Sequence, residues 1–187
     1  MFLKIKSDEV AIKGRGCADG RKQWDWLSKE DMSLPTMSTK GLMLLCIIDT
    51  MEDREVATAD IPGAFLKNDY DKGDIHIKLE GDMATLLEDT EPEYYKYFIY
   101  IDKLRSNFMY REDKKAIYGT LEASLLFWGK LSKSLEKMGY QRNEYNWCVM
   151  KKIVYRKRCA IIWHVDDLKT SNVDPAVVSR VLDDIDA

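Results

Sequence analysis

Hydrophobic residues recur at three- and four-residue spacing between positions 121 and 138, a pattern typical of a long amphipathic helix. The positions are Leu121, Leu125, Trp128, Leu131, Leu135 and Met138. Gly139 follows this stripe, and glycine commonly ends a helix. Two further helices are predicted, over 38–50 with Ser38 as its N-cap and over 175–185 after the Asp174 cap.

Alternating or continuous apolar stretches predict strands between these helices. The expected strands cover 9–17, 55–60, 74–79, 97–101, 147–155 and 159–165, with short helices over 82–88 and 92–96. No repeat or linker divides the chain, so we expect one domain over 1–187. The order strand, long helix, hairpin, helix predicts an α+β fold in which helices cover one face of an antiparallel sheet.

Two of the predicted strands end in acidic residues. The stretch 159–165 stops at Asp166 and Asp167, and the stretch 54–59 stops at Asp60. Two hard cations about 3.5 to 4 Å apart, held by carboxylates, can activate a hydroxyl and stabilise a leaving pyrophosphate. Because side chains alternate along a strand, only one of the two adjacent aspartates can point into such a site. The alternative is that all three are ordinary turn or cap residues.

Several short motifs follow one another in an order that identifies a family. Asp60–Leu66 reads D-I-P-G-A-F-L, Tyr118–Ser124 reads Y-G-T-L-E-A-S, and His164–Leu168 reads H-V-D-D-L. Weaker matches fall between and before them, at Ile12–Gly20, Ser33–Ser38, Gly73–Ile77 and Met138–Tyr140. Together they resemble the reverse transcriptase of Ty1/copia-type LTR retrotransposons, because the order carries more information than any single motif.

The resemblance implies a reverse-transcriptase palm with partial fingers, its antiparallel sheet packed on helices. Fingers would span about 1–55 and the palm about 55–187, with the thumb missing. The activity implied is RNA-directed DNA polymerisation by a fragment of a retrotransposon polyprotein, with two Mg²⁺ (or Mn²⁺) ions. The partners implied are an RNA or DNA template with its primer, and a dNTP.

The resemblance also assigns roles to individual residues. Asp60, Asp166 and Asp167 would be the catalytic metal ligands, with Asp166 the direct one of the adjacent pair. Phe65 would lie against the sugar 2′ position of the nucleotide, although a core aromatic fits its spacing equally well.

Four more residues would contact nucleotide or template. Lys13 and Arg15 would clamp the triphosphate, unless they belong to a solvated edge strand. Glu122 and Ser124 would lie near the template, where the family has glutamine and proline. His164 replaces the family's tyrosine and is more typical of a core-edge histidine than of a ligand.

Composition narrows the class of protein. The 187 residues are 45% hydrophobic and 33% charged, which suits a globular domain, and the net charge of −3 argues mildly against phosphate binding. The absence of an 18-residue apolar stretch and the charged N-terminus predict no membrane span and no signal peptide, so we expect an intracellular location, in a cytoplasmic particle or the nucleus. Four cysteines without Cys-x-x-Cys spacing predict buried thiols rather than zinc or disulfides.

Two other functions remain open at this stage. A two-metal phosphotransferase or nuclease would use the same carboxylates, with water as the nucleophile. A catalytically silent retroelement remnant or nucleic-acid-binding module would account for the departures at His164 and Glu122.

Overall fold

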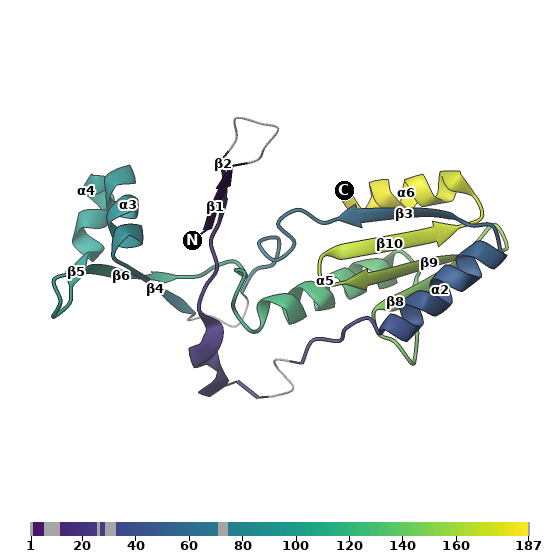
Figure 1. Ribbon diagram of the computed structural model, residues 1–187, viewed down its shortest axis with the longest axis horizontal. Helices are drawn as coiled ribbons and strands as arrows, with labels where there is room; N and C mark the ends of the chain where they lie inside the picture. The colour runs from purple at the N-terminus through teal and green to yellow at the C-terminus, as the bar shows by residue number, and fades with distance from the viewer. Residues whose placement is uncertain (1, 6–11, 26, 29–32, 71–74, 187) are drawn as a thin grey trace.

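The computed structural model describes residues 2–5, 12–25, 27–28, 33–70 and 75–186. Over these residues the chain is a mixed α+β fold whose antiparallel sheets pack on helices (Figure 1). The elements, in chain order, are β1 (Phe2–Ile5), β2 (Ile12–Arg15), η1 (Gly20–Asp25), α2 (Thr39–Met51), β3 (Glu55–Asp60), β4 (His76–Glu80), α3 (Asp82–Thr90), α4 (Pro92–Tyr95), η2 (Lys96–Phe98), β5 (Tyr100–Ile101), β6 (Asn107–Glu112), α5 (Ala123–Lys137), β7 (Gln141–Arg142), β8 (Val149–Val154), β9 (Lys157–His164), β10 (Asp167–Asn172) and α6 (Pro175–Asp186).

The largest sheet has five strands in the order β3-β10-β9-β8-β7, and every neighbouring pair is antiparallel. Two-residue turns connect β8 to β9 and β9 to β10. Tyr155 and Arg156 join β8 to β9 with φ of 48° and 63°, a conformation suited to the right-handed twist of a hairpin. Val165 and Asp166 join β9 to β10. The pairing of β10 with β3 brings residues 55–60 beside a strand more than a hundred positions away.

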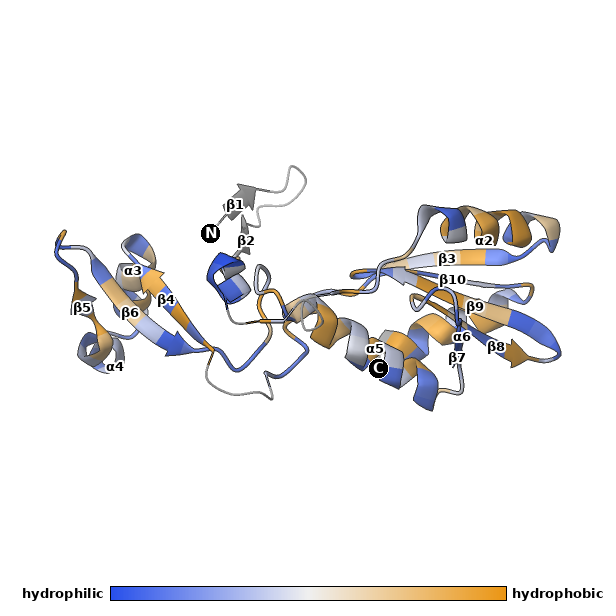
Figure 2. Ribbon diagram, turned by 90° about the horizontal axis from the view of Figure 1, so that it is seen from below, coloured by the Kyte–Doolittle hydropathy of each residue, from blue (hydrophilic) through white to orange (hydrophobic). Residues whose placement is uncertain are grey.

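Helices cover both faces of this sheet, so the expectation of one covered face is wrong. On one face, Trp163 and Leu168 pack with Phe127 of α5 and Val177 of α6 in the main core. On the other face, Leu45 of α2 packs on Ala160 and Ile162 in a smaller core. Figure 2 shows α2 on one side of the strands and α5 and α6 on the other. The apolar face of α2 packs on the sheet face that α5 and α6 leave open, because those two helices cover the opposite face.

The predicted helix ends are confirmed by their capping contacts. Ser38 Oγ accepts a hydrogen bond from the Gly41 amide at 3.1 Å, and Asp174 Oδ1 accepts one from the Ala176 amide at 2.9 Å. Gly139 has φ of +88° directly after α5, a conformation that glycine adopts without a steric penalty. None of the helices in the described ranges is long and apolar enough to cross a membrane.

Residues 75–112 build a separate small lobe, which we call the insert lobe. Its three-stranded sheet has the order β4-β6-β5, and α3 and α4 pack on one face of it (Figure 1). Met109 and Ala84 are fully buried between sheet and helices. The strand predicted over 97–101 is confined to its last two residues, because the 3₁₀ turn of η2 continues the preceding helix.

The N-terminal segment contributes β2 and the short η1. Residues 12–15 confirm part of the strand predicted over 9–17, and residues 6–11 lie outside the described residues. The Ala18 amide donates to the Tyr118 carbonyl at 2.7 Å. A Cβ on Gly119 would stand 2.0 Å from the Ala18 carbonyl oxygen, and its φ is +94°. Glycine is therefore required at this position of the Y-G motif for a packing reason.

The four cysteines do not share one environment. Cys148 and Cys159 are buried thiols, as expected, whereas Cys17 and Cys46 are exposed, so the expectation is wrong for those two. Cys46 lies on the outer side of α2, where the helix remains apolar although no described element covers it.

Candidate active site

Asp60 and Asp167 are direct partners across the β3–β10 pair, each at the end of its strand. Directly opposed residues on antiparallel strands project from the same face, with Cβ atoms about 4.5 to 5.5 Å apart. His164 is the partner of Asp167 on the other side, across the β9–β10 hairpin. Three neighbouring strands therefore place Asp60, Asp167 and His164 in one row.

Asp166 occupies the turn beside this row. Its carbonyl accepts a hydrogen bond from the Ile61 amide at 3.2 Å, which ties the turn to the residue after Asp60. Val165 has φ of +58° in the same turn. A β-branched residue in this region is a genuine backbone outlier, and such strain tends to occur where the surrounding structure fixes a functional segment. The three aspartates thus lie at one end of the sheet. Asp167 is the one directly opposite Asp60, whereas the resemblance implied that Asp166 is the direct ligand of the adjacent pair.

A pocket of about 420 Å³ opens on this face of the sheet, with the two opposed aspartates and His164 at its edge. Its floor is formed by strand residues, and its wall by Met37 before α2 and Leu42 within α2. The lining residues are Met37, Leu42, Thr58, Ala59, Asp60, Ile162, Trp163, His164, Asp167, Leu168 and Lys169. Acidic groups at the rim of a largely apolar hollow are the usual arrangement of a ligand site.

A buried charge network closes the side of the pocket nearest α2. Lys169 follows Asp167 by two residues on the same face of β10, and its ammonium group pairs with Asp49 Oδ2. Asp49 is 5% exposed, and its Oδ1 lies 3.6 Å from Arg54 Nη1. Arg54 also pairs with Glu52 at 2.7 Å. The ion pairs therefore connect α2 and the start of β3 to the strand that carries Asp167.

This network was missed by the sequence reasoning, although one signal was present. Asp49 stands among apolar residues near the end of the predicted 38–50 helix, and a buried carboxylate there requires a cation. Nothing in the sequence identifies Lys169 as that cation, because their pairing depends on how β10 lies under α2.

The carboxylates present are sufficient for a magnesium ion that is shared with a substrate. No group of three or more His, Cys, Asp or Glu side chains in the described part of the chain is arranged to hold a metal by itself. Magnesium, however, is commonly held by one or two carboxylates together with substrate phosphates and water. Asp60 and Asp167, on one face and open to the pocket, fit that mode of binding.

Phe65 lies in the core and not at the pocket. It is 7% exposed, with its ring 4.4 Å from that of Tyr118 and 6.1 Å from that of Phe127. Its spacing in the sequence left two roles open, and the structure shows Phe65 as a core aromatic. The pocket lining does not include it.

The two residues assigned to the template lie at the start of α5. Glu122 is 7% exposed and occupies the N-cap position, and Ser124 is half-buried in the first turn. Neither lines the pocket at Asp60.

Lys13 and Arg15 alternate along β2, as predicted. This strand pairs with β1 in a sheet of its own, apart from the five-stranded sheet (Figure 1). The structure does not describe their side chains, so the triphosphate clamp stays a prediction.

Comparison with known proteins adds no relative. No protein-family model matches the chain, and neither a curated protein nor a solved structure matches it.

Proposed function

We propose that this chain is a nucleotidyl-transfer palm of the reverse-transcriptase type, which extends a primer strand at the pocket beside Asp60 and Asp167. The observation that carries the proposal is the direct opposition of these two carboxylates at one end of an antiparallel sheet, next to a turn that supplies Asp166. The motif order along the sequence supports the same function.

The roles of the chain's own residues follow from their positions. Asp60 and Asp167 would hold Mg²⁺ together with the nucleotide phosphates, and the metal would supply activation of the primer hydroxyl and stabilisation of the leaving pyrophosphate. On the same face of the sheet, Ile162 and Leu42 give the pocket an apolar lining beside the carboxylates. A lower local dielectric strengthens their attraction to a cation.

Lys169 has a positioning role in this proposal. Its ammonium group is engaged with Asp49, so it is fixed along the wall of the pocket and does not bridge to Asp167 across the face of β10. The carboxylates of Asp60 and Asp167 therefore stay available to a metal ion.

Primer extension tests the proposal. The complete chain is incubated with a labelled primer annealed to an RNA or a DNA template, with dNTPs and Mg²⁺ or Mn²⁺. We expect extension that is lost in Asp60→Asn and in Asp167→Asn, and retained in the control Asp183→Asn, which changes an exposed aspartate on α6. Extension that survives both pocket substitutions would refute the proposed site, and shortening of the labelled strand would identify a nuclease instead.

A second candidate is a catalytically silent nucleic-acid-binding module. The observation that favours it is the placement of Phe65 and Glu122, two residues assigned to nucleotide and template, in buried positions away from the pocket. Binding of a primer–template without extension under either metal would support this candidate.

A further inference from the structure

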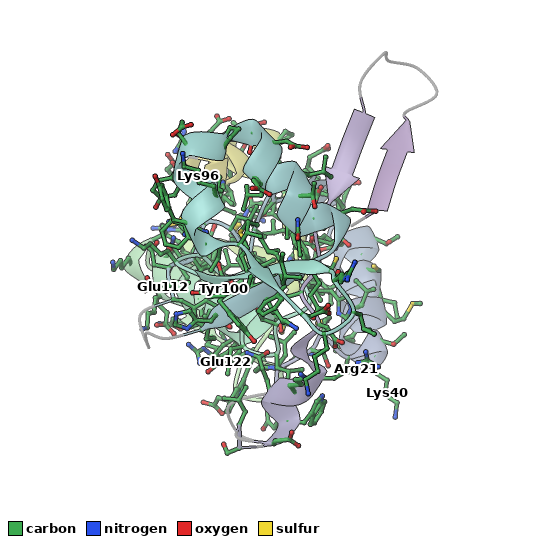
Figure 3. All side chains as sticks on the ribbon, turned by 90° about the vertical axis from the view of Figure 1, so that its left-hand side faces the viewer. Arg21, Lys40, Lys96, Tyr100, Glu112 and Glu122 are labelled. Carbon is green, nitrogen blue, oxygen red and sulfur yellow. The ribbon has the colours of Figure 1, made fainter. Side chains whose placement is uncertain are left out.

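The insert lobe has an open sheet face that carries aromatic rings. On the helix-covered face, Met109 is fully buried, and the Arg111 guanidinium lies over the rings of α4 and η2. Side chains alternate, so the neighbouring positions of β6 face the other way. Phe108 and Tyr110 therefore project from the uncovered face, together with Tyr100, the partner of Phe108 on β5. Figure 3 views the lobe from its outer end, with Lys96 on the helical side and Tyr100 at the sheet.

The rings form a continuous surface. Tyr100 stacks on Phe108 with centroids 5.6 Å apart and planes 26° apart, and Tyr110 meets Phe108 edge-on at 5.9 Å. Tyr100 is 55% exposed and Tyr110 is 53% exposed, so most of each ring faces solvent. With Phe98 at the edge, they are the only residues that line a shallow hollow of about 430 Å³ in the described structure. We call Tyr100, Phe108 and Tyr110 the aromatic platform; Phe98 lies at its edge, with its ring next to the Arg111 guanidinium on the helix-covered side.

Cationic side chains border the aromatic platform. The Lys78 ammonium group lies 4.6 Å from the centroid of the Phe108 ring, on the same face of the sheet. Lys103 and Arg105 are exposed in the turn that joins β5 to β6. Asp102 in the same turn keeps its negative charge, and its Oδ1 accepts the amides of Leu104 and Ser106 at 2.8 Å each. Glu80 pairs with Lys78, and Glu112 lies at the far end of β6.

We propose that the aromatic platform binds the unpaired bases of a single-stranded nucleic acid. Planar rings on an open antiparallel sheet accept stacked bases of any sequence, and nearby Lys and Arg side chains attract the phosphates between them. A proline-rich peptide also docks on aromatic grooves, but it carries no phosphates that would match the exposed Lys103 and Arg105. The inference goes beyond the polymerase proposal and does not depend on it, because the platform lies in a different sheet from Asp60.

Fluorescence anisotropy with the complete chain tests this inference. The probes are labelled twelve-nucleotide oligouridine and oligothymidine, which separate RNA from DNA. We expect the double variant Tyr100→Ala with Tyr110→Ala to bind more weakly than the native chain, by about tenfold for each ring removed. The same loss is expected for each probe that the native chain binds. The matched control is Tyr145→Ala, which removes an exposed tyrosine outside the insert lobe and should leave the affinity unchanged.

Two further measurements distinguish loss of binding from loss of folding. Tyr100→Phe with Tyr110→Phe keeps both rings and should restore native affinity. Ultraviolet crosslinking of an iodouridine oligonucleotide to the native chain should place the attached peptides at Tyr100, Phe108 or Tyr110. Absence of oligonucleotide binding, equal affinity of the alanine variant and the Tyr145 control, or binding of a proline-rich peptide instead would each overturn the inference. The Tyr100→Ala with Tyr110→Ala variant keeps Asp60 and Asp167, so primer extension and probe binding can be measured on the same protein, and failure of the polymerase proposal is distinguishable from failure of this one.

Discussion

Asp60 of β3 is the register partner of Asp167 of β10, so the two carboxylates project from the same face of the sheet. Like charges in this position repel each other and destabilise a sheet by roughly 0.2 to 1 kcal/mol. A pair of this kind reduces stability unless a cation lies between the carboxylates. The proposed metal site requires this opposition, and the repulsion between the two carboxylates gives a way to test it.

The first prediction follows from this repulsion. Without divalent metal at neutral pH, Asp60→Asn should raise the free energy of unfolding by a few tenths to about 1 kcal/mol, because one of the two opposed charges is removed. Urea denaturation measures the change. Added Mg²⁺ should stabilise the native chain more than the variant. Asp183→Asn is the control, since Asp183 is an exposed aspartate of α6, outside the β3–β10 pair. Equal metal responses in native chain and Asp60→Asn would contradict the proposed site.

The second prediction concerns strain at Val165, whose φ is +58° in the turn before Asp166. Glycine adopts this conformation freely, whereas a β-branched residue held there costs of order 1 to 3 kcal/mol. Both substitutions should lower the free energy of unfolding. The loss for Val165→Gly should be smaller than the loss for Val154→Gly by about 1 kcal/mol or more. Val154 is also partly buried against the main core, but it lies within β8. Paired urea denaturations compare them, and equal losses would show that the turn is not strained.

The third prediction concerns the ion pair between Asp49 and Lys169. Asp49→Ala leaves Arg54 and Lys169 without their shared partner, and the loss of one member of a buried ion pair typically costs about 3 to 5 kcal/mol. Lys169→Met should cost less, because Arg54 still compensates Asp49. The control Lys96→Met breaks an exposed pair with Glu93 and should change the free energy of unfolding by less than about 1 kcal/mol. A cost for Asp49→Ala no larger than that of the control would refute a stabilising role.

Local sequence signals predicted the elements whose ends are set by nearby residues. The helices over 38–50 and 175–185 and the strand ending at Asp60 are present because caps and apolar periodicity act over a few positions. The predicted apolar stripe of the long helix is partly wrong. Leu131 and Leu135 are buried as predicted, but in the turn before them Phe127 is buried and the predicted Leu125 is only partly buried. The packing of α5 on the sheet decides which of its faces is buried.

Elements that depend on distant partners were not predicted. β10 reads L-K-T-S-N after Asp167, which looks like a polar loop, yet Thr170, Ser171 and Asn172 are almost completely buried. This segment is a strand because β3 and β9 pair with it on both sides. The same dependence explains the candidate site. The sequence indicated that three aspartates end strands, but only the β3–β10 register decides that Asp167 opposes Asp60.

The fourth prediction concerns cysteine reactivity. Burial raises the pKa of the Cys148 thiol to about 11, and its Sγ donates a hydrogen bond to the Pro35 carbonyl at 3.1 Å. The thiolate is the reactive form, so iodoacetamide at pH 8 should modify Cys148 roughly a hundredfold more slowly than the exposed Cys17 and Cys46. Mass spectrometry of timed samples measures each site. Urea should abolish the difference, and rapid modification of Cys148 in the folded chain would contradict its burial.

The fifth prediction compares two carboxylates that both contact Lys115, Asp113 and Asp69. Burial raises the pKa of Asp113 above its ordinary value of 3.8, against a weaker contribution from the Lys115 amide, which donates to Oδ1 at 3.3 Å. The folded chain therefore holds this proton to higher pH than the unfolded chain does, and stability falls as the pH rises through that window. Asp113→Asn removes the penalty, so it should be more stable than the native chain at pH 7. The gain should disappear below the ordinary carboxyl pKa.

Asp69 provides the control of opposite sign. A hydrogen bond from Lys115 Nζ, 2.5 Å away, lowers the pKa of Asp69, so its contribution to stability is present above the ordinary carboxyl pKa and is lost as the pH falls through the lowered value. Asp69→Asn should therefore be less stable than the native chain at pH 7, by a small amount because the pair is exposed. Urea denaturation from pH 3 to pH 8 follows both variants. Because burial acts on Asp113 and a cation acts on Asp69, the two difference curves should have opposite signs at neutral pH and converge in acid; curves of the same sign would show that Asp113 is not desolvated.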